Sequence, residues 1–180
     1  MAMSHLIKTP MLTTIHGLIT PDAKIIWDHY DWYYNTISYA QRKSMPIIAN
    51  RQFVGVIYNA IQVETYPYCE KKDGYILFLA RFSPEKGAHH AIEVAKRLGK
   101  KLLMAGKVDR QDKEYFSTEV EPKIDGKQIQ FLGEADAEQK RVLYAGACCL
   151  LMPINWEEPF GLNIIEAMAC GTPVIAFSRG

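Results

Sequence analysis

The region from Tyr75 onward alternates short apolar runs with longer segments of helical pattern, and this alternation restricts the fold more than any other feature. The run 75–80 is apolar throughout, which is typical of a parallel strand buried on both faces. Strands that alternate with helices predict an α/β fold with an open, Rossmann-like, doubly wound parallel sheet. The expected strands are 75–80, 101–105, 128–132, 148–152 and 174–177, and the expected helices are 88–98, 112–121, 136–146 and 161–170.

The residues before Tyr75 carry a weaker version of the same pattern. We expect strands at 11–16, 36–38 and 54–58, a helix at 23–34 and a short helix at 39–43. Trp27, Tyr30 and Tyr34 recur at helical spacing, which favours packing into a core over a sugar-binding platform. Pro67, Asp73-Gly74 and a charged run indicate a boundary, so the expected organisation is a partial N-terminal segment (1–60), a linker (61–74) and a second domain (75–180).

Composition excludes several classes of protein. The net charge of +1 disfavours a nucleic-acid partner, because a protein that binds nucleic acid is expected to carry a basic face. No apolar run approaches the ~20 residues that span a bilayer. The four cysteines lack metal-ligand spacing and are expected to be reduced, buried thiols, and no metal is expected. A cytoplasmic location follows as an expectation, with peripheral membrane association of a full-length protein as an alternative.

The sheet predicts where a ligand would bind. In open α/β sheets, ligands bind beyond the carboxyl ends of the strands, which selects 81–87, 106–109, 133–134 and 153–162 as one rim. Neither GxGxxG nor GxxxxGK[ST] occurs, which argues against a dinucleotide dehydrogenase and a P-loop nucleotidase.

Two cations follow the first of these strands. Arg81 can grip phosphate oxygens as a fork, and Lys86 can add a mobile point charge. The alternative is a solvated loop in which Glu85 pairs with Lys86, and spacing alone does not separate the two. His16, at the end of the first expected strand, is by itself more typical of a structural histidine than of a catalytic one.

The segment 156–176 combines carboxylates with a helix start. Glu158 precedes the expected helix and Glu166 lies eight positions later, in a largely apolar segment where an unpaired carboxylate is costly to bury. The first turn of the helix offers N–H groups that favour an anion. Carboxylates that accept hydrogen bonds from hydroxyls, beside amide N–H groups that donate to phosphate, suit a phosphorylated sugar.

Together these motifs resemble a known family. The motifs are residues 80–87, the turn 131–134 and the segment 158–174, which contains the E-x7-E spacing and Gly-Thr-Pro-Val. They are similar to family 4 of the nucleotide-sugar-dependent glycosyltransferases (glycosyl transferases group 1), which have the GT-B fold. Residues 13–17 and 56–61 resemble the N-terminal strand with its histidine and the interdomain segment of that family. Residues 75–180 would then be the donor-binding domain.

The resemblance implies a role for each matching residue. Arg81 and Lys86 would neutralise the donor diphosphate, Glu158 would lie near the transferred sugar, and Glu166 would hold the ribose hydroxyls. His16 would face the donor sugar. The remaining donor contacts would come largely from the main chain, at Val108, Gly133, Phe160, Gly161 and Leu162.

The implied reaction is transfer of a sugar, with retention of anomeric configuration and no metal or other cofactor. The donor would be a UDP, GDP or ADP sugar, and the acceptor a hydroxyl of a sugar, a lipid or another molecule. Full-length members are longer, so we expect a truncated member with apolar surface along the last strand and the aromatic stretch near Trp27, and hence self-association. A catalytically inactive nucleotide-sugar-binding module and an unrelated α/β protein are the alternatives.

Overall fold

The computed structural model describes residues 6–46 and 52–179, which form two compact units. One unit comprises the described residues up to Ala60 together with Glu157–Phe160. The larger unit comprises Ile61–Trp156 and Gly161–Arg179. The expected linker, 61–74, therefore belongs to the larger unit, while four residues of the expected second domain belong to the smaller one.

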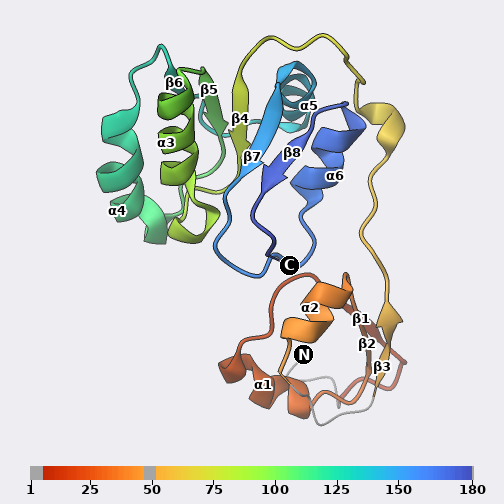
Figure 1. The fold of residues 1–180 in the computed structure, drawn as a ribbon. Coiled ribbons are helices and arrows are strands. Elements are labelled where there is room, and N and C mark those ends of the chain that lie inside the picture. Colours follow the sequence, from red (N-terminus) through yellow and green to blue (C-terminus); the bar gives the residue numbers. More distant parts are fainter. Residues whose placement is uncertain (1–5, 47–51, 180) are drawn as a thin grey trace. The chain divides into compact units, whose positions relative to one another are not determined.

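The larger unit contains a five-stranded sheet in the order β6-β5-β4-β7-β8, and every adjacent pair is parallel. This confirms the predicted doubly wound α/β sheet (Figure 1). The strands are β4 (Ile76–Leu79), β5 (Leu102–Ala105), β6 (Ile129–Phe131), β7 (Cys149–Met152) and β8 (Val174–Ala176).

Successive strand residues point to opposite faces of the sheet. Since all four residues of β4 are buried, both faces of the sheet are covered, and helices provide this cover. Ile76 and Phe78 of β4 pack with α3 (Ala88–Leu98) in one core cluster. Leu77 and Leu79 pack in a second cluster, with α5 (Ala137–Gly146) and α6 (Leu162–Ala169). The carboxyl ends of the strands are left open between these layers.

Local signals explain most helix boundaries. Asp136 caps α5 and forms a capping box with Gln139, and Gly99 ends α3 in the left-handed conformation. The segment expected as a helix around 112–121 is helical throughout, but only Lys113–Tyr115 (α4) is α-helical, and it continues as a π-helical turn, Phe116–Val120.

The smaller unit contains a parallel sheet in the order β1-β2-β3, formed by Leu12–Ile15, Tyr33–Thr36 and Phe53–Val56. Two helices accompany it, α1 (Pro21–Asp28) and α2 (Tyr39–Ser44). The expected helix 23–34 is therefore too long, since Tyr34 lies in β2. Trp27, Tyr30 and Tyr34 nevertheless meet in one core, as expected for packing residues.

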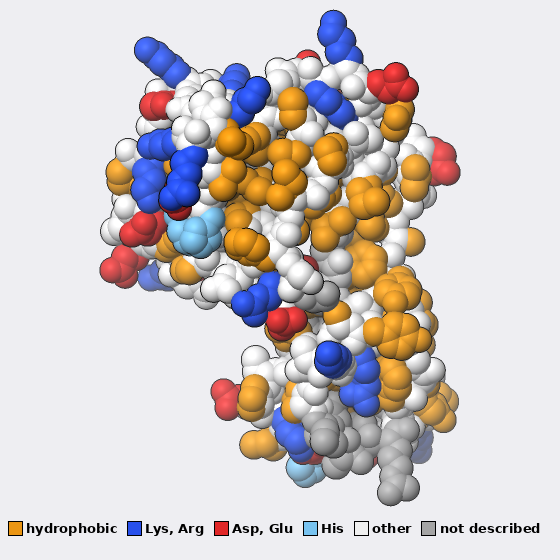
Figure 2. All heavy atoms as spheres, in the orientation of Figure 1, with side chains coloured by type: hydrophobic (Ala, Val, Ile, Leu, Met, Phe, Trp, Pro, Cys, Tyr) orange, Lys and Arg blue, Asp and Glu red, His pale blue; other side chains and the backbone are white. Residues whose placement is uncertain are grey.

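On the face drawn in Figure 2, the larger unit carries a patch of exposed apolar side chains. Ile175 and Phe177, at and just beyond β8, are each 57% exposed and line a groove with residues of α3. In the stretch around Trp27, Trp27 itself is buried, whereas Ile25, Ile26 and Tyr33 are exposed. Among the described residues, no helix has both the length and the apolar character needed to cross a membrane.

Candidate functional site

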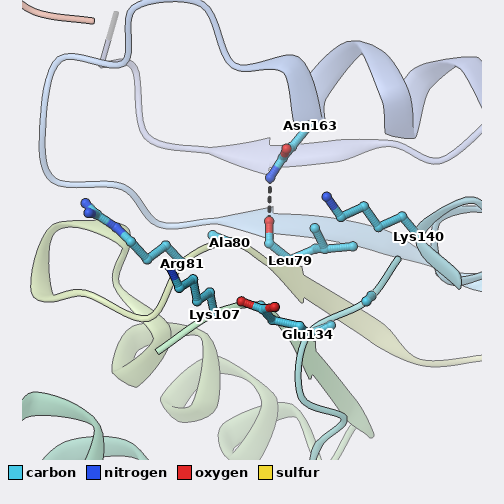
Figure 3. A pocket seen from close by; sticks show the side chains of 10 residues that line it. Leu79, Ala80, Arg81, Lys107, Glu134, Lys140 and Asn163 are labelled. Carbon is cyan, nitrogen blue, oxygen red and sulfur yellow. Dashed lines mark hydrogen bonds between the residues drawn. The ribbon is translucent and has the colours of Figure 1, made fainter. Parts of the chain in front are cut away.

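A pocket of about 400 Å³ lies in the larger unit, at the carboxyl ends of β4 and β5. Three cationic side chains line it, from Arg81, Lys107 and Lys140, together with the carboxylate of Glu134 (Figure 3). Asn163, in the first turn of α6, closes another side of the pocket. The pocket therefore combines positive side chains with a helix start, as an anion site requires.

Close backbone packing shapes the floor of this pocket. Gly106 has φ of +148°, and a Cβ at this position would lie 1.8 Å from the carbonyl oxygen of Ala80. The Gly106 N–H donates to the carbonyl of Gly133 at 2.9 Å. The Asn163 side chain donates to the carbonyl of Leu79, which ties α6 to the end of β4 (Figure 3). A side chain at Gly106 would force these strand ends apart.

Arg81 is held by two carboxylates. Its guanidinium donates to Glu85 Oε1 at 2.6 Å and lies 3.6 Å from Asp109 Oδ2, while Lys107 Nζ lies 2.7 Å from Asp109 Oδ1. The hydrogen bond from Lys107, with the nearby Arg81, lowers the pKa of Asp109. Glu85 therefore pairs with Arg81, and the guanidinium of Arg81 is oriented before any ligand arrives.

Lys86 has a different environment. Its ammonium lies 4.4 Å from the ring centroid of Trp156, a cation–π contact. The loop is anchored beside it, because the Asn155 N–H donates to the carbonyl of Glu85 at 2.7 Å and a Cβ on Gly87 would lie 2.3 Å from the Pro153 carbonyl oxygen. Lys86 is not among the residues that line the pocket of Arg81.

Glu166 lies one turn along α6 from Asn163, so the two residues share a helix face. Its carboxylate accepts hydrogen bonds from Tyr66 Oη at 3.1 Å and from Tyr144 Oη at 2.8 Å. These hydroxyls stabilise the carboxylate that the sequence places in an apolar segment. Glu166 does not line the pocket of Arg81 either.

Two predicted site residues lie in the smaller unit. His16 is exposed directly after β1, and the buried Gln41 side chain donates to the carbonyls of Ile15 and Gly17 on either side of it. Glu158 lies in the segment Glu157–Phe160, which is anchored because Ser38 Oγ donates to the carbonyl of Pro159.

The remaining predicted residues lie in loops or at helix starts. Phe160 contacts the ring of Tyr58 in the smaller unit, with ring centroids 6.1 Å apart. Gly161 caps α6 with φ of +79°, and Leu162 is its first residue. Val108 packs against the core beside α3, and Gly133 follows β6 with φ of +78°.

Several residues of the site escaped the sequence reasoning. Lys107 lies within the predicted rim 106–109, just after β5, although no role was predicted for it. Lys140 and Asn163 lie in helices, and Tyr66 and Tyr144 lie far from Glu166 in the sequence. No local pattern marks these four.

Comparison with known proteins identifies the family. Residues 69–180 match the family model described as glycosyl transferases group 1. The chain belongs to this family. It is 27% identical to an uncharacterised glycosyltransferase of Methanocaldococcus jannaschii over 99% of this chain and 54% of that protein. It is 29% identical to a glycogen synthase of Mycobacterium tuberculosis over 71% of this chain and 32% of that protein.

The fold is also that of solved glycosyltransferase structures of the GT-B type. The Anabaena HepE protein, crystallised with UDP and glucose, superposes with a TM-score of 0.80 at 19% identity, over 98% of this chain and 55% of that one. The group 1 chain thus spans about half the length of HepE and of its Methanocaldococcus relative, and less of the glycogen synthase.

Proposed function

We propose that this group 1 chain binds a nucleoside-diphosphate sugar and takes part in transfer of the sugar to an acceptor hydroxyl, with retention of anomeric configuration. The observation that carries the proposal is the pocket of Arg81, Lys107 and Lys140 beside the first turn of α6. A diphosphate is the part of such a donor that three cations and a helix N-terminus would hold. Membership of a glycosyltransferase family supplies the reaction class.

The cations would stabilise the departing nucleoside diphosphate. Charge develops on the leaving group as the glycosidic bond breaks, and cations positioned in advance lower the energy of that state. Arg81 is already oriented by Glu85 and Asp109, so an entering diphosphate would compete with these carboxylates for its N–H groups. Lys86 would add its charge by leaving the ring of Trp156.

The other roles follow from the family resemblance. Glu166 would accept the ribose hydroxyls, and main-chain groups at Phe160, Gly161 and Leu162 would contact sugar and phosphate. Glu158 and His16 would act at the transferred sugar. Main-chain groups near Val108 and Gly133 would contact the base. No metal or cofactor enters this proposal.

Calorimetric titration with UDP, GDP and ADP tests donor binding. We expect at least one of them to bind and Arg81→Gln to weaken it about 10- to 100-fold, the range for a hydrogen bond to a charged group. Arg97→Gln is the matched control, because Arg97 also pairs with a glutamate four residues away, Glu93, but lies at the far end of α3. Absence of heat for all three nucleotides would refute the proposal, as would equal losses for the two variants.

Incubation with radiolabelled UDP-, GDP- and ADP-sugars then separates transfer from binding. Release of sugar to an acceptor or to water, with the α or β configuration of the product read by NMR, tests turnover and retention. Binding without release would instead support the catalytically inactive binding module.

A further inference from the structure

The carboxylate of Glu166 is enclosed by two tyrosines from different parts of the larger unit. Tyr144 comes from α5 and is fully buried, and its hydroxyl donates to Oε2 at 2.8 Å. Tyr66 precedes β4, and its hydroxyl donates to Oε1 at 3.1 Å. Because each oxygen has its own phenolic donor, both the position and the plane of the carboxylate are determined.

The Glu166 carboxylate has acceptor sites beyond those that the tyrosines use. An ionised carboxylate offers about four lone-pair sites. The two tyrosines occupy one on each oxygen, which leaves one on each oxygen for a ligand. Two acceptors held side by side match the two donors of a vicinal diol, such as the 2′- and 3′-hydroxyls of a ribose.

The surroundings keep both phenols as donors. Burial, and then the carboxylate of Glu166, raises the pKa of the Tyr144 hydroxyl and that of Tyr66, so neither ionises near neutral pH. The guanidinium of Arg141 lies over the ring of Tyr66 at 5.6 Å from its centroid. The Tyr66 ring is thereby packed in place beside α5.

We propose that Tyr66 and Tyr144 are positioning residues that orient the Glu166 carboxylate for a ribose diol and so make this chain select ribonucleotides over 2′-deoxyribonucleotides. This inference rests on the proposed donor binding and adds to it a source of specificity. Neither tyrosine touches the ligand; both act through Glu166.

The test compares UDP, GDP and ADP with their 2′-deoxy counterparts by calorimetry on the full chain. We expect wild type to bind the ribonucleotide about tenfold more tightly than its deoxy form, the value of one hydrogen bond to a charged group. Tyr144→Phe should bring this ratio close to one, mainly by weakening the ribonucleotide. Tyr66→Phe, at a less buried site, should lower the ratio in the same direction.

Tyr75→Phe is the matched control. Tyr75 is also buried, and its hydroxyl donates to the carbonyl of Leu143 in α5 at 2.8 Å, so the variant loses a buried hydroxyl from the same core without touching Glu166. Its ribose-to-deoxyribose ratio should match that of wild type. In a Glu166→Gln background, Tyr144→Phe should change the ratio no further.

The outcomes separate the two proposals. A wild-type ratio in both Tyr144→Phe and Tyr66→Phe, in chains that still bind nucleotide, overturns the positioning role and leaves donor binding intact. An equal drop in Tyr75→Phe also overturns it. Failure of wild type to bind any of the three ribonucleotides overturns donor binding and the positioning role together.

Discussion

Lys72 provides the sharpest test of how the larger unit is held together. Its ammonium donates to the carbonyl of Ala145 at 2.9 Å, to the carbonyl of Cys170 at 3.1 Å and to Thr172 Oγ1 at 2.9 Å. Ala145 lies in the last turn of α5 and Cys170 caps the end of α6, and neither helix has a basic residue in its own last turn. One lysine from outside both helices therefore supplies the cation that two helix dipoles favour.

Replacement of Lys72 by Met keeps the apolar stem and removes all three hydrogen bonds. A cation at a partly buried helix end contributes about 1 kcal/mol, up to about 2. Two helix ends, plus the hydroxyl of Thr172, give an expected loss of about 2–4 kcal/mol, with water replacing part of the lost bonding. For a unit of this size, 3 kcal/mol corresponds to a fall in Tm of about 10 °C.

Urea unfolding followed by far-ultraviolet circular dichroism measures this loss. With m near 2 kcal/mol/M, we expect the midpoint to fall by roughly 1.5 M at unchanged m. Lys71→Met is the control, because Lys71 is the exposed neighbour of Lys72. If the two variants lose the same stability, or Lys72→Met loses less than about 0.5 kcal/mol, the assignment of Lys72 to both helix ends is wrong.

Two further perturbations address the pocket floor and the core. Gly106→Ala should destabilise the chain by more than about 2 kcal/mol and abolish nucleotide binding, because the new Cβ would overlap the Ala80 carbonyl. Gly126 is the control, since it also has a positive φ but a Cβ there would meet nothing within 4 Å. Gly126→Ala should cost about 1 kcal/mol and leave binding unchanged. Comparable losses in thermal melts of both variants would contradict the clash. Burial, and then Asp73, raises the pKa of Tyr75 to about 12, so its contribution to stability is complete below pH ~10 and is lost as pH rises toward ~12. Unfolding free energies measured across this window should fall less steeply in Tyr75→Phe than in wild type, and identical slopes would show that Tyr75 ionises normally.

The strands and most helices of the larger unit were predictable because local pattern and tertiary position agree. The apolar run of β4 is buried on both faces, and Asp136 and Gly99 mark helix ends by their own chemistry. The helix 23–34 was overextended because Trp27, Tyr30 and Tyr34 have a spacing that fits one helix. The chain instead ends α1 at Asp28 and brings Tyr34 to the same core from a strand.

The site was predictable only where it follows strand ends. Arg81 was selected because it follows β4, and its pocket is at that position. The partners of Arg81 and Glu166 were not predictable, since side-chain pairing depends on distances between elements. Tyr66 and Glu166 are 100 residues apart in sequence, and nothing local to either indicates that they meet.

The anchor of the segment Glu157–Phe160 has a consequence for synthesis of the chain. Ser38 caps α2, and the carbonyl to which its hydroxyl donates belongs to Pro159, 121 residues later. At about 5–20 residues per second, a ribosome would need roughly 6 to 24 s to deliver that acceptor. The smaller unit therefore cannot complete its hydrogen bonds until residues 61–156 of the larger unit have been synthesised.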